Sequence, residues 1–303
     1  MLALPNNKWH FVAWEKDLRD RKTFRLYDHK YLLLDRKLTP DRCSHRGASL
    51  STGTFVDGCV KCPYHGRRFS PHTTPDLFGG VIRDGALWYG GEDPEEIPAI
   101  PEFQDPSYRT VYMSRRLRDV SPLAFLEAGL DFEHVKSVHS LSVADIIPPS
   151  VDIDRRTNTN VHVFDTPRLV LRIDTQFWLP LTNCLKFHLH DKVSGRDWKP
   201  FILWFSMTPH GPRDMTLHVR SMRQKTNQSG RGPPWTPDLD LLLDVFFKGI
   251  SDVPVFEDAR VVRTVDVRRM FEDALTPEDD FIACYREQMV GECPHLLEYF
   301  LEC

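Results

Sequence analysis

Two short loops in the first quarter of the chain each combine one thiol with one imidazole. Cys43 is followed by His45 and Cys62 by His65, and 16 residues separate the two pairs. Thiolates and imidazoles are ligands for iron and zinc. Two thiolates on one iron and two imidazoles on a second give a [2Fe–2S] cluster that is less negative than an all-thiolate one, so its reduction potential is higher. Pro63 and the nearby glycines let backbone N–H groups approach the inorganic sulfide.

The amino-acid sequences of both loops resemble those of the Rieske [2Fe–2S] family. The first loop reads CSHRGASLS, and the second reads CPYHG with Phe69 close behind. Residue types, spacings and flanking turn residues all agree with that family. We expect Tyr64 to donate its hydroxyl to a ligand sulfur and thereby tune the potential. Arg67 stands where the family often has Trp, so the packing beside the cluster must differ.

A structural zinc site is the alternative interpretation of this region. It would use Cys43, Cys59, Cys62 and His65, since Cys59-x-x-Cys62 also has zinc-ligand spacing. The Cys-x-His half does not suit zinc, and Cys59 falls where a strand should lead into the second loop. We therefore favour the cluster.

A second constellation follows about 65 residues later, in the order Asp131, His134, His139. Two imidazoles and a carboxylate from elsewhere make the facial triad of a non-haem Fe(II) site. We expect a helix here, begun by Ser121 as N-cap and Pro122 in the first turn. Residues five apart on an ideal helix point about 140° apart, so a π-bulge or a helix end must bring the histidines together.

The pattern D-x-x-H-x-x-x-x-H downstream of a Rieske module looks like the catalytic α subunit of the Rieske non-haem iron oxygenases. That resemblance implies that Asp131 is not a ligand but an electron bridge from a ligand histidine to a Rieske histidine of the neighbouring subunit. The third ligand should be a carboxylate on a late helix, where Asp258 takes the family position. Glu257 is the fallback and Asp252 a distant third.

Besides Arg67, further positions depart from the family pattern. Glu127 and Ala128 stand where an Asn is frequent, and Arg263 and Asp266 replace a later Glu and Gln. His188 and His190 share a strand face and could mimic a ligand pair, but no carboxylate partner is evident.

The composition describes an ordinary globular protein. Of 303 residues, 41% are hydrophobic and 27% charged, and the formal charge of −4 gives no reason to expect nucleic acid. No run approaches the ~20 apolar residues that span a bilayer. Seven cysteines without disulfide-framework spacing favour a reducing compartment, so we expect a soluble cytoplasmic protein.

The element pattern predicts two domains. Short strands dominate the start, with further strands at Val56–Cys62 and Ala86–Tyr89, and a proline-rich stretch over residues 92–106 reads as a linker. We place a small all-β Rieske domain at 1–108 and a helix-grip-like α+β catalytic domain with an antiparallel sheet at 109–303. Its expected strands include Leu169–Ile173, Cys184–His190 and Ile202–Met207, and its later helices cover Thr236–Phe247, Phe256–Phe271 and His295–Leu301.

The resemblance implies an oxidoreductase. A Rieske-type monooxygenase or dioxygenase would use O₂, a [2Fe–2S] cluster and Fe(II) to hydroxylate, dihydroxylate or oxidatively demethylate a small, largely apolar organic substrate. Because no G-x-G-x-x-G follows a strand, a separate NAD(P)H-dependent reductase, with or without a ferredoxin, would supply electrons. The family assembles as head-to-tail homotrimers. The alternative is a Rieske ferredoxin-like electron-transfer protein without oxygenase activity.

Apolar strand residues are the candidates for the substrate pocket, although they could equally form core: Phe177, Trp178, Phe187, Trp204, Phe205 and Met207.

Overall fold

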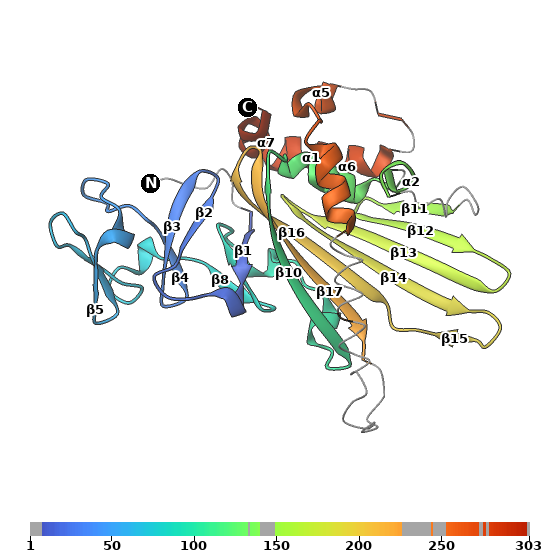
Figure 1. The fold of residues 1–303 in the computed structure, drawn as a ribbon, viewed down its shortest axis with the longest axis horizontal. Helices are drawn as coiled ribbons and strands as arrows, with labels where there is room; N and C mark the ends of the chain where they lie inside the picture. Colours follow the sequence, from blue (N-terminus) through green and yellow to red (C-terminus); the bar gives the residue numbers. More distant parts are fainter. Residues whose placement is uncertain are drawn as a thin grey trace.

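The computed structural model describes residues 8–132, 134–139, 149–225, 244, 253–272, 275–276 and 279–301. Three small antiparallel sheets at the N-terminal side stand beside one large antiparallel sheet, and helices gather at one end of the large sheet (Figure 1). The predicted class, an all-β region followed by an α+β region, is confirmed.

The N-terminal region is built from three three-stranded sheets. Short strands with tight turns fold around a small core formed by Leu32, Leu50, Val60 and Phe69, which also contains Cys43 and Cys62. The strands are β1 (His10–Trp14), β9 (Ala86–Tyr89) and β8 (Val81–Arg83); β2 (Thr23–Leu26), β3 (His29–Leu34) and β4 (Lys37–Pro40); and β5 (Thr54–Val56), β6 (Cys59–Lys61) and β7 (Arg68–Phe69).

The strand predicted over Val56–Cys62 is confirmed for Cys59–Lys61, but a turn at Asp57-Gly58 separates this strand from β5, which ends at Val56. Asp57 and Gly58 have φ angles of 50° and 69°. Two successive positive φ angles match the twist of a tight hairpin, and Asp-Gly is a favoured pair there. Cys59 consequently pairs with Val56 across the hairpin, and β6 leads directly into the second thiol-imidazole loop.

The large sheet has the order β10-β17-β16-β14-β13-β12-β11, with β15 paired to β14. The three strands predicted from the sequence lie within β13, β14 and β16 and are confirmed. The bounds are β10 (Tyr108–Arg118), β11 (Ser150–Asp154), β12 (Thr159–Asp165), β13 (Leu169–Trp178), β14 (Thr182–Asp191), β15 (Arg196–Asp197), β16 (Phe201–Gly211) and β17 (Asp214–Gln224).

Strand alternation divides the six candidate pocket residues between the two faces of this sheet. Phe205 and Met207 line a cavity together with Asp258 of a late helix, and Phe177 and Phe187 share their face by register. Trp204 points the other way and packs against Phe11 and Trp14 of the N-terminal region. Trp178 packs on that second face as well, so neither tryptophan faces the helices.

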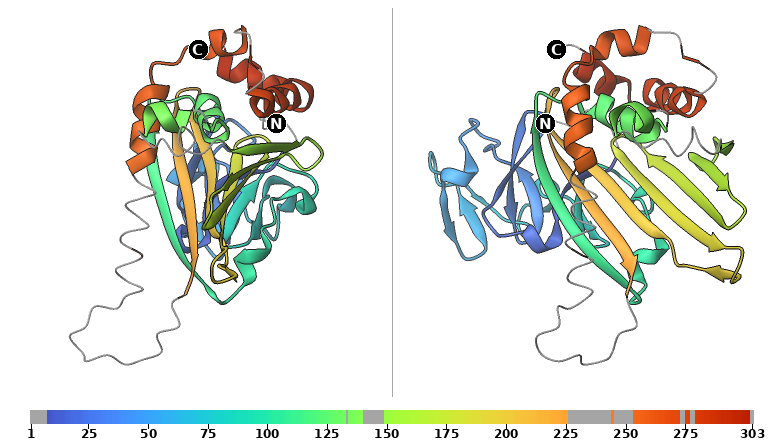
Figure 2. Two further views of the ribbon diagram at one scale, coloured as in Figure 1. Left: turned by 90° about the vertical axis from the view of Figure 1, so that its right-hand side faces the viewer. Right: turned by 45° about the vertical axis from the view of Figure 1, so that its right-hand side comes forward.

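The helices cover one end of the sheet (Figure 2). They are α1 (Pro122–Leu130), α2 (His134–Val138), a helix over 253–262, α5 (Val267–Glu272), α6 (Asp280–Glu292) and α7 (Pro294–Leu301). Ser121 caps α1 as predicted, since its side chain accepts from the Ala124 N–H. Of the helix predicted at Thr236–Phe247, only Asp244 lies within the described residues.

The single helix predicted over Phe256–Phe271 is two helices. The first ends at residue 262, and the Thr264 hydroxyl donates to the Val261 carbonyl at 2.7 Å. Asp266 then accepts from the Arg268 N–H at 3.1 Å, which caps the start of α5. The helical spacing of apolar residues continues through the break between these two helices, so this spacing alone did not predict the break.

A continuous core joins the two regions. One buried cluster unites Leu33 and Leu87 with Leu117 and Met207, and an aromatic cluster unites Trp88 with Trp204. The division at residue 108 stays a prediction; Tyr108 begins β10 and is itself buried in the aromatic cluster. In the described part of the chain no helix is long and apolar enough to cross a membrane.

Candidate metal centres

The two thiol-imidazole loops have the same backbone hydrogen bonds. The Cys43 N–H donates to the Ala48 carbonyl and the Cys62 N–H to the Arg67 carbonyl, each at 2.8 Å. The N–H groups of Gly47 and Gly66 return to the two cysteine carbonyls, and both glycines have φ of +72°. This left-handed backbone conformation favours glycine at both positions, because an L side chain would be strained there.

These loops place the four predicted cluster residues at one tip of the molecule. Cys43 and Cys62 are buried, whereas His45 and His65 are exposed, with their Nδ1 atoms 3.3 Å apart. The pKa of the Cys62 thiol is lowered, first by the backbone N–H of Tyr64 and then by that of His65. Backbone donors aimed at sulfur, with two ring nitrogens converging, fit a cluster held by two thiolates and two imidazoles.

Tyr64 does not make the predicted contact with a ligand sulfur. Its ring lies over His65 at a centroid distance of 3.9 Å, its side chain is 59% exposed, and within the described residues its hydroxyl has no hydrogen bond. The zinc alternative also gains no support. Among the residues described, the one group of three metal-ligating side chains with atoms within 4.8 Å of one another includes neither Cys59 nor Cys62.

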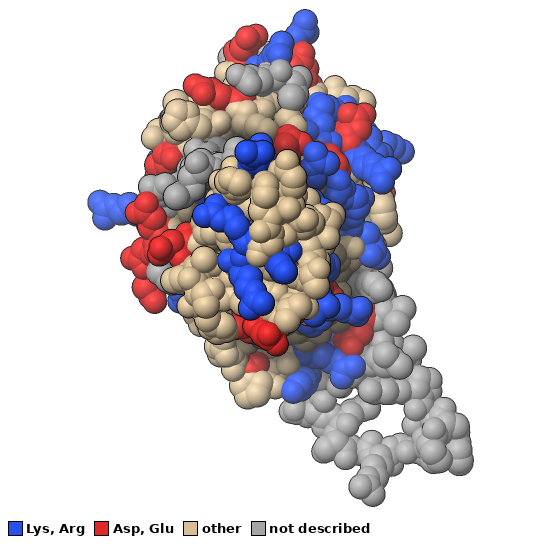
Figure 3. Space-filling view, turned by 90° about the vertical axis from the view of Figure 1, so that its left-hand side faces the viewer, with Lys and Arg blue, Asp and Glu red and all other residues tan. Residues whose placement is uncertain are grey.

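The exposed tip carries many cations. Arg42, Arg46, Lys61, Arg67 and Arg68 are all exposed around the two histidines. Figure 3 views this end of the molecule, where Lys and Arg side chains are spread across the surface.

The second centre begins where the helix of Ser121 ends. Sequence analysis placed Asp131, His134 and His139 on one helix, but α1 stops at Leu130 and Asp131 is extended (ψ 114°). The Asp131 carboxylate accepts from the His134 N–H at 3.3 Å and so caps α2. His139 lies directly after the last residue of α2, so a helix end rather than a π-bulge turns it back toward His134.

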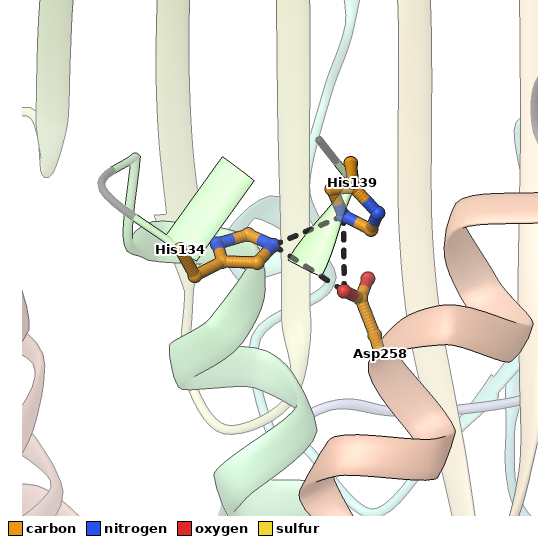
Figure 4. A group of neighbouring side chains, drawn as sticks. All are labelled: His134, His139 and Asp258. Carbon is orange, nitrogen blue, oxygen red and sulfur yellow. Dashed lines mark hydrogen bonds and ion pairs between the residues drawn. The ribbon is translucent and has the colours of Figure 1, made fainter. Parts of the chain in front are cut away.

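Three side chains converge on one point, as Figure 4 shows. His134 Nε2 and His139 Nε2 are 3.2 Å apart, and Asp258 Oδ1 lies 3.3 Å and 3.0 Å from them. Ligands about 2.1 Å from an ion and at right angles to one another are about 3 Å apart, which is the spacing of one face of an octahedron.

The surroundings of these atoms fit a cation. The three side chains are 16%, 8% and 14% exposed, and Asp258 Oδ1 is buried without a hydrogen-bond partner among the described residues. Burial lowers the pKa of His134, but Asp258 and, after it, Asp131 together outweigh this effect, so the net shift is upward. Converging acceptors in a buried site are unfavourable until a positive charge lies between them.

The other acids near the triad take separate positions. Glu257 Oε2 lies 2.8 Å from His139 Nδ1, on the far side of that ring from Asp258. Asp131 contributes its main-chain carbonyl, 2.5 Å from His134 Nδ1. Asp252 lies outside the described residues.

Glu127, at a departure from the family pattern, forms a buried ion pair. Both of its oxygens accept from the Arg286 guanidinium, at 2.8 and 2.7 Å. Burial raises the pKa of Glu127, and Arg286 opposes the shift. The pair lines a cavity of about 260 Å³ that also touches Asp131 and His134, so this charge balance belongs to the site.

A second cavity, of about 270 Å³, lies on the β12 side of Asp131 and includes Asn160 and His162. Asn183 borders Asp258 on the other side. Sequence reasoning missed these polar residues. Asn160 and His162 share the buried face of β12 with Phe164, and Asn183 pairs with Phe205, so their place on the same sheet face as apolar residues was the available signal. His188 and His190 face away, where Asp174 and Asp197 pair with them.

Comparisons with known proteins find similar domains and chains. The model of the Rieske [2Fe-2S] domain matches residues 8–78. The chain is 31% identical over 150 residues to the methylxanthine N1-demethylase NdmA of Pseudomonas putida, covering 42% of this chain and 43% of that protein. It is 30% identical over 165 residues to the oxygenase component of dicamba O-demethylase from Stenotrophomonas maltophilia, covering 46% and 48%. The matches thus span less than half of these curated relatives.

Solved structures extend the likeness to the whole fold. Dicamba monooxygenase bound to 3,6-dichlorosalicylic acid superposes with a TM-score of 0.75 at 19% identity, covering 98% of this chain and 99% of that one. A mutant of NdmA with caffeine gives 0.71 at 20% identity, covering 98% and 94%.

Residues 8–78 thus match the Rieske [2Fe–2S] domain, and the chain shares its two-region fold with these solved structures. More particularly, its sequence and fold match the catalytic α subunits of the Rieske non-haem iron oxygenases, proteins that carry a [2Fe–2S] cluster and a mononuclear Fe(II).

Proposed function

We propose that this protein is a Rieske-type oxygenase that uses O₂ and externally supplied electrons to hydroxylate or oxidatively demethylate a small, largely apolar organic molecule. The observation that carries the proposal is the convergence of His134 Nε2, His139 Nε2 and Asp258 Oδ1 at 3.0–3.3 Å in the same chain as a Rieske domain. When bound, the cluster supplies single electrons and the mononuclear Fe(II) supplies O₂ activation.

Each residue has an assigned role. Cys43 and Cys62 hold one iron of the cluster, and His45 and His65 hold the other. His134, His139 and Asp258 would hold the mononuclear Fe(II).

Asp131 is the proposed electron bridge between subunits. It lies at the break between α1 and α2, in contact with His134. We infer that its carboxylate links His134 to an exposed Rieske histidine of a neighbouring subunit, in a homotrimer. Within one chain the exposed histidines and the triad occupy different regions, which is why a neighbour must complete the path.

The substrate would lie against the helix-facing side of the sheet. Partly buried apolar residues are available there: Leu171, Leu185, Phe187, Leu189, Phe201 and Leu203. An apolar wall suits a small aromatic or alicyclic molecule. Oxidative demethylation is the preferred outcome, because two similar proteins are named N1- and O-demethylases.

Electrons would arrive from a separate NAD(P)H-dependent reductase, with or without a ferredoxin. The cation-rich tip around His45 and His65 suits an acidic donor protein. All six described cysteines are free thiols, which fits a reducing compartment such as the cytoplasm.

The alternative is a Rieske electron-transfer protein without oxygenase activity. Electron transfer by the cluster does not require a buried group of two imidazoles and a carboxylate, so the triad argues against this alternative.

The decisive test compares two variants purified without oxygen. His134→Ala should keep the visible absorbance of the cluster but lose the mononuclear iron and all turnover. Asp131→Ala should keep both metals, yet its reduced cluster should not be reoxidised in a single turnover with substrate and O₂. Two irons per chain in the reconstituted wild-type protein, rather than three, would support the alternative, and normal reoxidation in Asp131→Ala would refute the bridge.

A further inference from the structure

Two consecutive acids contact opposite nitrogens of one imidazole. Asp258 Oδ1 lies 3.0 Å from His139 Nε2, and Glu257 Oε2 lies 2.8 Å from His139 Nδ1. Neighbouring residues on a helix point about 100° apart, so one helix can present both carboxylates to the same ring. Val255, Ala259 and Val262 form the buried face of this helix, which fixes its rotation against the core.

Because the two nitrogens of an imidazole differ in protonation, the contacts at Nε2 and Nδ1 of His139 have different roles. A neutral imidazole carries one N–H, and the other nitrogen keeps the lone pair that a metal needs. If His139 is to offer Nε2, its proton must lie on Nδ1. The His139 side chain is only 8% exposed, so that N–H needs an acceptor within the protein. Glu257 is the acceptor at hydrogen-bonding distance.

The Nδ1–H of His134 also needs an acceptor, and here the acceptor is a neutral group. The acceptor at His134 Nδ1 is the main-chain carbonyl of Asp131. Both Nδ1 atoms thus have an acceptor, and both Nε2 atoms remain directed at Asp258 Oδ1 (Figure 4). The two imidazoles differ because a carboxylate polarises the N–H of His139 more strongly than a carbonyl polarises that of His134.

We propose that Glu257 is a positioning residue for the mononuclear centre: it is not a ligand, but it holds His139 in the tautomer and orientation that present Nε2 to the metal. This inference rests on the proposed function, because it takes His134, His139 and Asp258 as the ligands. Glu257 is 37% exposed, so water can replace part but not all of its effect on a ring that is nearly buried.

The test measures Co(II) affinity of the full-length protein with its cluster intact and its mononuclear site emptied. Co(II) is titrated anaerobically and followed by its d–d absorption and by calorimetry. Glu257→Ala should raise the Co(II) dissociation constant about 10- to 100-fold, the usual loss for a partner of a ligand histidine. Glu257→Gln should retain most of the affinity, because its amide oxygen still accepts from Nδ1–H. The d–d bands should shift in Glu257→Ala and return toward wild type in Glu257→Gln.

Matched variants make every outcome decisive. Glu272→Ala removes an exposed acid at the end of α5 and should leave the affinity unchanged. The cluster absorbance and the far-ultraviolet circular dichroism of each sample confirm that it is folded. Wild-type affinity in Glu257→Ala overturns the inference. Equal losses in the Ala and Gln variants also overturn it, since charge alone would then be responsible.

Asp258→Ala separates this inference from the proposed function. A loss in Glu257→Ala as complete as in Asp258→Ala would make Glu257 a ligand and overturn its positioning role. If Asp258→Ala loses Co(II) binding and Glu257→Ala does not, the proposed function stands and only this inference fails. If Asp258→Ala binds Co(II) normally, the assignment of the metal centre itself is wrong.

Discussion

The two candidate metal centres are built in opposite ways. The cluster loops lie within 23 residues of sequence, Cys43 to His65, on two turns with matching hydrogen bonds, and their histidines face solvent. The triad joins α2 to a helix more than a hundred residues later, and its side chains are nearly buried. A local, exposed centre suits exchange of electrons with partner proteins. A buried centre assembled from distant elements suits control of the access of water and substrate.

The two centres should therefore be lost independently, which is the largest effect expected. Asp258→Ala should remove one iron per chain and leave two irons and two sulfides, because the cluster loops do not touch the triad. Cys62→Ser should remove the cluster, because one thiolate cannot hold its iron. Iron and acid-labile sulfide assays with visible absorption measure both, and joint loss of the centres in Asp258→Ala would contradict their separation.

The shared core predicts that the two regions unfold together. Trp204 is 1% exposed and packs between Phe11, Trp14 and Trp88. Trp204→Ala should cost about 3–5 kcal/mol of unfolding free energy, the usual cost of emptying an aromatic core site. Chemical denaturation should show one transition, at lower denaturant, by both cluster absorbance and far-ultraviolet circular dichroism. If the circular dichroism transition moves to lower denaturant and the cluster absorbance transition does not, residues 1–108 unfold independently of the large sheet.

The junction should also make the protein sensitive to acid. Burial lowers the pKa of His10 and of His218 to about 3 and that of His210 to about 4. Between pH 6.5 and about 3 the unfolded chain binds protons that the folded chain excludes, so stability falls as pH falls, by about 1.4 kcal/mol per pH unit for each histidine.

His218→Gln should remove about a third of that slope. Glutamine does not titrate and can still bond to Ser114, which lies 2.9 Å from His218 Nδ1. Urea unfolding at pH 7, 6 and 5 measures the slope, and His72→Gln, an exposed histidine, serves as control. An unchanged slope in His218→Gln would place the acid sensitivity elsewhere.

The smallest effect is expected at the exposed tip. Arg67→Gln removes one of five cations around the cluster, so reduction by an acidic donor protein should slow a few-fold at low salt, and the difference should vanish at high salt. Stopped-flow absorbance at several ionic strengths measures the rate. Arg196→Gln, at exposed β15 in the large sheet, should have no effect.

Short-range features could be predicted from the sequence, and each has a local physical cause. The cluster loops depend on Cys, His and Gly at fixed spacings, the cap of α1 on Ser121-Pro122, and the strands on alternation. Where the local pattern was ambiguous, the prediction was less accurate. Asp57-Gly58 turned a predicted strand into a hairpin, and Asp131 and Asp266 ended predicted helices because their side chains accept from the next helix N-terminus.

The sequence by itself determined which residues could bind metal, because ligand chemistry depends on residue type and spacing. Only the tertiary structure decided how they meet: that a helix end returns His139 to His134, that Asp258 rather than Glu257 shares their Nε2 side, and that Trp204 faces the N-terminal region while Phe205 faces the triad. Those outcomes depend on the rotation of a helix and the face of a sheet, which long-range packing sets and no local run of residues encodes.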